Sequence, residues 1–280
     1  DYDGLPLQYT KRDLERFKDG TNPNYYPNVN WYEEGTRNFS ENNQFNVMMR
    51  GGGKRVRYMA LLDYKNKFGL LNEDYTHYSD RYNSQIRTYE LGLRMNLDVD
   101  ITSSTQMKFG LYGIIGEDKR PNTAINTIFQ NFYKVPAAAF PVKTLNNNWG
   151  SNTLFKMNPI AAIADVGYVQ ENRRMLETDM RITQDFSMFL KGLSAEVAVA
   201  YDNTATFQDI GSKTYKYEVG YLSEEGLPVS ETYGTDSKVQ ITKSVLSAQL
   251  IRASVEAKLN YDYTSGKHQL SASAVYRQDM

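Results

Sequence analysis

The sequence predicts an all-β fold, an antiparallel transmembrane β-barrel segment whose long loops lie on one side of the membrane. Three observations predict it: apolar and polar residues alternate, the alternating stretches are long, and the connections between them are short and long in turn. The clearest stretch covers residues 87–102, where seven consecutive odd positions, from Tyr89 to Ile101, are apolar and no even position is. A period of two describes an extended strand with one apolar and one polar face.

The same alternation recurs along the chain and predicts about eight membrane strands. The other strands are expected near residues 44–50, 56–64, 107–115, 176–182, 193–201, 253–263 and 270–276. Several alternating stretches run 11 to 16 residues, whereas strands of soluble proteins usually have about 5 to 6. Such lengths suit tilted strands that cross a bilayer and continue beyond it.

The connections differ in length from one end of the predicted strands to the other. Short turns are expected at 51–53, 103–105, 187–191 and 264–267, and long connections at 67–85, 118–172 and 203–248. Short turns on one rim and long loops on the other are typical of outer-membrane barrels. Residues 213–221 resemble a further strand, so we expect an extra hairpin within an extracellular excursion over 203–248.

The first 43 residues differ from the rest and are predicted to be an extracellular loop region with one short helix. The helix is expected over residues 11–18, with Thr10 as its N-cap and Gly20 just past its end. The following run of Asn, Pro, Gly and aromatic residues is typical of a loop. Residues 44–280 then form the strands and loops of the barrel.

The composition excludes several classes of protein. The 280 residues carry a formal net charge of -1, so we expect no nucleic-acid partner. Cysteine is absent, which removes disulfides, zinc–thiolate sites and cysteine nucleophiles. No run of about 18 apolar residues could form a transmembrane helix, and the mean hydropathy of -0.60 is compatible with barrel strands.

No convincing catalytic, cofactor or metal site can be read from the sequence. The glycine-rich run at 51–57 lacks the spacing of a phosphate-binding loop and is expected to be a hairpin turn. His77 and His268, the only histidines, belong to no serine–histidine–aspartate set. Asp98 and Asp100 share one strand face, but a catalytic carboxylate pair also needs a pocket and a partner. We therefore expect no enzyme activity, no cofactor and no metal.

Seven motifs in this order resemble the barrel of the SusC-like (RagA-type) TonB-dependent outer-membrane transporters of Bacteroidetes. They are DLERFKDGTNPNYYPNVNWYEEGTR, FNVMMRGGGKRVRYMALLDYKNKFGLL, YNSQIRTYELGLRMNLDVDIT, EDKRPN, NPIAAIADVGY, LKGLSAEVAVAYDN and LNYDYTSGKHQLSASAVYRQ. Each motif is moderately specific, and their shared order covers essentially the whole chain.

The resemblance implies a function and a set of partners. Members of this family import oligosaccharides, or in some cases peptides, across the Gram-negative cell outer membrane. They place an N-terminal plug inside a 22-stranded barrel, the size class with a plugged lumen. They couple to TonB through an N-terminal box and carry a SusD-like surface lipoprotein over the barrel mouth. The present sequence shows neither plug nor TonB box, so we expect an internal segment of such a barrel.

Aromatic residues in the predicted extracellular loops are the only ligand-binding candidates. Aromatic faces stack on sugar rings and line peptide pockets. The alternative for each residue is packing among the loops or docking against the lipoprotein. The candidates are Tyr25, Tyr26, Trp31, Tyr32 and Trp149.

Two other classes of protein remain open. A soluble β-sandwich carbohydrate-binding module could use the same alternation with its apolar faces turned inward. A glycoside hydrolase would need an acid/base pair that the sequence does not reveal. Strand length, the asymmetry of loop lengths and the resemblance favour the transporter.

Overall fold

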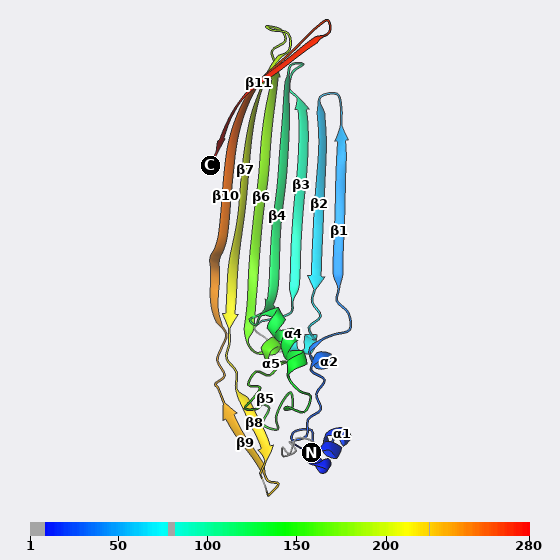
Figure 1. Ribbon diagram of the computed structural model, residues 1–280, viewed down its shortest axis with the longest axis vertical. Coiled ribbons are helices and arrows are strands. Elements are labelled where there is room, and N and C mark those ends of the chain that lie inside the picture. The colour runs from blue at the N-terminus through cyan, green and yellow to red at the C-terminus, as the bar shows by residue number, and fades with distance from the viewer. Residues whose placement is uncertain (1–8, 78–81, 224) are drawn as a thin grey trace.

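The computed structural model describes residues 9–77, 82–223 and 225–280, and most of them belong to one long antiparallel sheet (Figure 1). Eight strands follow one another in the order β1-β2-β3-β4-β6-β7-β10-β11. Their bounds are β1 Asn42–Gly52, β2 Val56–Phe68, β3 Arg87–Asp100, β4 Thr105–Pro121, β6 Gly167–Asp185, β7 Leu193–Ser212, β10 Gln240–Ser265 and β11 His268–Asp279. The predicted fold class, an antiparallel sheet of eight long strands, is confirmed.

Short turns join the strands at one end of the sheet and long connections join them at the other (Figure 1). The long connections cover residues 69–86, 122–166 and 213–239. They carry a second sheet of β5 Trp149–Ser151, β8 Tyr217–Leu222 and β9 Pro228–Tyr233. Among the described residues, no helix is both long and apolar enough to cross a membrane.

The register of the large sheet aligns the apolar stripes of neighbouring strands. One row of paired Cα atoms runs across six strands, through Tyr58, Leu97, Phe109, Met180, Val199 and Val255. A slip of one residue at any strand would turn its apolar set to the other face. The aligned pattern therefore builds one continuous apolar face and one polar face.

The apolar face is open to its surroundings. Leu93 is 38% exposed, Val197 50% and Leu259 49%. Soluble monomers rarely expose contiguous apolar surface across a whole sheet. This exposure marks the face as one that another apolar medium covers.

The N-terminal helix α1, Lys11–Asp19, forms where the sequence places it. The Thr10 hydroxyl accepts a hydrogen bond from the Asp13 amide, and the Asp13 carboxylate accepts one from the Thr10 amide. Gly20 ends the helix with a φ of 66°. This reciprocal cap satisfies two backbone donors that the helix itself leaves unpaired.

Four further helices occur in the described parts of the loops, although the sequence predicts only the N-terminal helix. They are α2 Trp31–Gly35, α3 Glu73–Thr76, α4 Ile125–Lys134 and α5 Ala161–Ala164. Three of them have five residues or fewer, too short to show a helical period. The ten residues of α4 begin without a side-chain cap, so no N-terminal signal identifies it.

The strands continue further into the long-loop end than the alternation indicated. β4 and β6 reach into 118–172, and β7 and β10 pair Thr206–Ser212 with Gln240–Ala248, inside the predicted 203–248 excursion. Register shifts interrupt the β7–β10 ladder between Thr242 and Val245 and between Leu246 and Ala248. Backbone pairing persists where the side chains stop alternating, so periodicity alone underestimates these strands. The expected extra hairpin is formed by β8 and β9.

The main cluster of buried apolar residues lies among the loops. We call the described residues of 20–41, 69–86, 122–166 and 213–239 the loop module. Its core is built by side chains from α2, α4, α5 and β5, among them Trp31, Ile128, Phe132, Trp149 and Ile160. The loop module therefore has a packed interior of its own at one end of the sheet (Figure 1).

Candidate functional site

The polar face of the sheet carries an ion network that crosses four strands. The Glu90 carboxylate contacts Lys65 Nζ at 3.2 Å and Arg173 Nη2 at 2.7 Å, and Lys65 also contacts Asp63 at 2.8 Å. Gly116 of β4 lies in register between Glu90 and Arg173. It brings no side chain between the two charges, and a Cβ there would stand 3.5 Å from Arg173 Nη2, at van der Waals contact.

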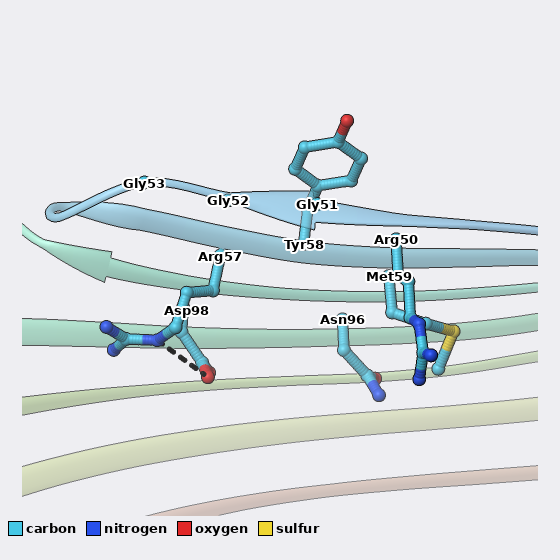
Figure 2. A pocket seen from close by; sticks show the side chains of 9 residues that line it. All are labelled: Arg50, Gly51, Gly52, Gly53, Arg57, Tyr58, Met59, Asn96 and Asp98. Atoms are coloured by element: carbon cyan, nitrogen blue, oxygen red, sulfur yellow. Dashed lines mark ion pairs between the residues drawn. The ribbon is translucent and has the colours of Figure 1, made fainter.

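The same face is charged at the short-turn end (Figure 2). Arg50, Arg57, Asn96 and Asp98 project to one side of the sheet there, and Tyr58 projects to the other. Arg57 contacts Asp98 at 3.8 Å and Asp100 at 3.4 Å. The two carboxylates thus share one guanidinium instead of facing each other, and the glycine-rich segment next to them is a hairpin turn.

Trp31 and Trp149 are buried inside the loop module. Each indole is 2% exposed. Trp31 Nε1 donates to the Pro136 carbonyl at 3.2 Å, and Trp149 Nε1 donates to Asp165 at 2.9 Å. Their rings belong to the core, as the loop-packing alternative expects, and neither ring offers a face to a ligand in this structure.

The three tyrosine candidates each have different surroundings. Tyr32 is 41% exposed and packs edge-on against Phe132. Tyr26 accepts a hydrogen bond from Arg16 at 2.5 Å. Tyr25 alone lines a cavity. The structure therefore does not bring the five aromatic candidates together in one site.

That cavity, of about 200 Å³, lies between the loops and the hairpin of β8 and β9. Its lining includes Tyr25, Thr144, Asn146, Glu218 and Ser230. Glu218 is 3% exposed. Its carboxylate accepts hydrogen bonds from Asn146 at 3.1 and 3.2 Å and from Asn148 at 2.8 Å. We call it the Glu218 cavity.

The local sequence explains how these groups meet. Glu218 is paired in the small sheet with Gly150 of β5 and Thr232 of β9. Asn147 adopts a φ of 61°, in the left-handed region that Asn tolerates better than most residues. The resulting turn, closed by the Thr144 amide donating to the Asn148 carbonyl at 2.9 Å, directs the amides on either side of Asn147 to the carboxylate.

Sequence reasoning missed Glu218 and the asparagines that hold it. The available signals were a carboxylate within the short strand YEVGYL and the run of three asparagines at 146–148. Neither segment identifies the other, because 70 positions separate Asn148 from Glu218. Only the parallel pairing of β5 with β8 joins them.

A second charged group of the loop module lies beside the buried indole of Trp149. Lys143 Nζ stands 3.3 Å from the centre of this ring. Burial lowers the pKa of Lys143 to about 8, although the negative charges of Asp165 and Asp236 act to raise it. Burial also raises the pKa of the Tyr215 hydroxyl to about 12. Among the described residues, no group of three or more His, Asp or Glu side chains could hold a metal ion.

Comparison with known proteins identifies the kind of fold. No family model matches the chain, and no curated protein matches it. The solved structure of the RagAB peptide importer in its open-open state matches 99% of this chain and 38% of its own, at 12% identity and a TM-score of 0.54. Another structure of the RagAB peptide transporter matches 97% of this chain and 34% of its own, at 11% identity and a TM-score of 0.49.

A third solved structure, the outer-membrane transporter YddB from Escherichia coli, matches 86% of this chain and 28% of its own, at 10% identity and a TM-score of 0.39. The chain spans about a third of the length of the structures it matches. In fold, the large sheet is similar to part of a peptide importer. More particularly, that sheet and its loops are similar over nearly their whole length to part of the open-open RagAB structure.

Proposed function

We propose that this chain forms part of the barrel wall of a nutrient importer in the outer membrane of a Gram-negative cell. The observation that carries the proposal is the two-faced sheet, with exposed apolar side chains on one face and ion pairs on the other. Lipid suits the first face, and a water-filled or plugged lumen suits the second. In this arrangement the loop module lies on the extracellular side, because outer-membrane barrels place long loops there.

The imported ligand in this proposal is a peptide or an oligosaccharide. The similarity in fold to a structure described as a peptide importer supports the first ligand class. The resemblance to SusC-like transporters supports either class, together with a SusD-like surface lipoprotein and the TonB complex as partners. No enzymatic step and no cofactor form part of the proposal.

The soluble β-sandwich module requires a second sheet over the apolar face. Among the described residues, the remaining strands form only the small sheet β5-β8-β9, in the long connections. Large apolar side chains such as Phe45 and Tyr276 stay 62% exposed. These features favour the membrane wall over the sandwich.

Cell fractionation tests the proposal directly. An antibody raised against this segment should detect, in the outer-membrane fraction, a band well above the 32.1 kDa of this chain. That band should migrate faster when the sample is not boiled, as folded barrels do in detergent gels. A band of 32.1 kDa in a soluble fraction would contradict the proposal.

A further inference from the structure

The Glu218 cavity contains a buried carboxylate that the described residues leave without a cationic partner. Three amide hydrogen bonds hold the carboxylate. Within the described part of the chain, no Lys or Arg forms an ion pair with it. A buried carboxylate is costly unless it is both hydrogen-bonded and paired with a positive charge. The hydrogen bonds are present here, but no positive charge from the described residues is paired with the carboxylate.

One lining residue of the cavity has an unsatisfied polar atom. The Thr144 hydroxyl oxygen is buried and has no hydrogen-bond partner in the structure, yet Thr144 lines the same cavity as Glu218. The side-chain amides of Asn146 and Asn148 are already used on the carboxylate. The lining also includes Asn24, so amide donors are present, and what the described lining lacks is a positively charged side chain.

The walls of the cavity favour an organic cation over a bare ion. Pro141 and Pro228 are among its lining residues, as is the ring of Tyr25. A volume of about 200 Å³ is several times what one water molecule needs. Aliphatic walls and an aromatic ring suit the carbon skeleton that carries an amine, whereas a hard metal cation takes several oxygen ligands.

We propose that the Glu218 cavity binds a protonated primary amine carried on a short carbon skeleton. The ammonium group donates to the Glu218 carboxylate, and its skeleton lies against Tyr25 and the prolines. Such an amine occurs in the lysine side chain or amino terminus of a peptide and in an amino sugar. Binding requires only the loop module, so the inference stands apart from the transport proposed above.

Gly220 offers a way to close the cavity without touching the carboxylate. It faces Ser230 across the β8–β9 pair, and a Cβ on it would stand 4.0 Å from the Tyr25 ring. Its φ is not in the positive region. Gly220→Leu therefore fills the cavity by packing, whereas Glu218→Gln removes the charge and keeps the size of the side chain. Glu231→Gln, in the same hairpin, removes an exposed charge outside the cavity lining and serves as the matched control.

Isothermal titration calorimetry on the full-length protein in detergent tests the inference. The two cationic probes are Nα-acetyl-lysine amide and glucosamine, and their neutral matches are Nα-acetyl-norleucine amide and N-acetylglucosamine. At least one cationic probe should bind at one site, at least about tenfold more tightly than its neutral match, because a charge-assisted hydrogen bond is worth about that factor. Glu218→Gln and Gly220→Leu should each abolish that preference, and Glu231→Gln should keep it.

The two cationic probes separate the possible sources of the amine. Binding of the lysine derivative alone assigns the cavity to peptides, and binding of glucosamine alone assigns it to amino sugars. Equal binding of charged and neutral probes, or no binding of either cation, would overturn the inference. So would cation binding that both cavity variants retain. Fractionation of cells decides the transport proposal separately, so failure of one is distinguishable from failure of the other.

Discussion

Arginine at Met95 provides the sharpest test of which face of the sheet meets lipid. Twelve residue steps separate Tyr89 from Ile101, the ends of the apolar stripe that follows β3 and continues one residue past it. That is about 40 Å along an antiparallel strand, and about 30 Å along the membrane normal at a tilt near 40°. Met95 lies at the midpoint, is 40% exposed, and pairs with Ala60 and Leu111, neither of which can neutralise a cation.

The expected cost of Met95→Arg is about 2–4 kcal/mol, the range for a cation on the lipid face at the bilayer midplane. At about 1.4 kcal/mol per decade this lowers the folding equilibrium constant about 30- to 1000-fold. Asn96→Arg is the matched control, because its side chain lies on the polar face between Met59 and Gly110. Ile101→Arg, at the short-turn end of the stripe, should cost only about 0–1 kcal/mol.

The assay is a denaturant titration of the full-length protein folded into lipid vesicles, with the shift of unboiled protein on detergent gels as the readout. The order of stability should be Asn96→Arg, then Ile101→Arg, then Met95→Arg. Equal stability of Met95→Arg and Asn96→Arg, or a larger loss for Asn96→Arg, would refute the assignment of the apolar face to lipid.

Three further predictions concern the short turns before β7 and between β10 and β11, the ion network around Glu90, and the loop module. Gly192→Ala should strongly reduce the amount of folded protein on detergent gels, because Gly192 has a φ of 87° and an added Cβ would stand 1.7 Å from the Asp262 carbonyl oxygen. Gly266→Ala is the control: with a φ of 58° and open space around it, it should lower the free energy of unfolding by only about 1–2 kcal/mol. Glu90→Gln should lower the free energy of unfolding by about 1 kcal/mol, because the ion pairs it loses are partly exposed, and the difference should shrink in high salt. The free energy of unfolding of the loop module should rise between pH 8 and pH 10. The folded protein releases the Lys143 proton near its pKa of about 8, whereas the unfolded chain keeps this proton up to its ordinary pKa of 10.5. The unfolded state therefore binds more protons in that window, which makes stability increase with pH. Trp149 fluorescence during denaturation reports this rise, and Lys143→Met should flatten it.

The membrane strands could be predicted because lipid and lumen impose opposite demands on adjacent residues. From Tyr89 to Ile101, along β3 and one residue past it, successive residues lie on opposite faces of the sheet. The polarity of each residue therefore indicates the face on which it lies. Beyond the apolar stripe this constraint ends. The ladder of β7 and β10 continues to Ser212 and Gln240, where neither face has to be apolar. The sequence there carries no period from which the strand could be predicted.

The loop module could not be predicted because its order comes from contacts between distant segments. Ser84 donates to the Ile163 carbonyl at 2.7 Å, and Asn158 donates to the carbonyls of Val142 and Gly150 at 3.1 and 2.9 Å. Each of these short segments looks like a polar loop when considered alone. Their helices and small sheet become stable only when the three long connections pack together, and no local pattern encodes that packing.

The position of the aromatic residues follows from the same physical requirement. A loop module at the end of a single sheet cannot bury its apolar groups on that sheet, so it must build a core from its own side chains. The largest rings belong to this core, and Trp31 and Trp149 are accordingly buried. Large aromatic residues in such loops therefore indicate where the loops fold. A binding site is better indicated by polar groups that the finished fold leaves incomplete, and the carboxylate of Glu218 and the hydroxyl of Thr144 are two such groups in one cavity.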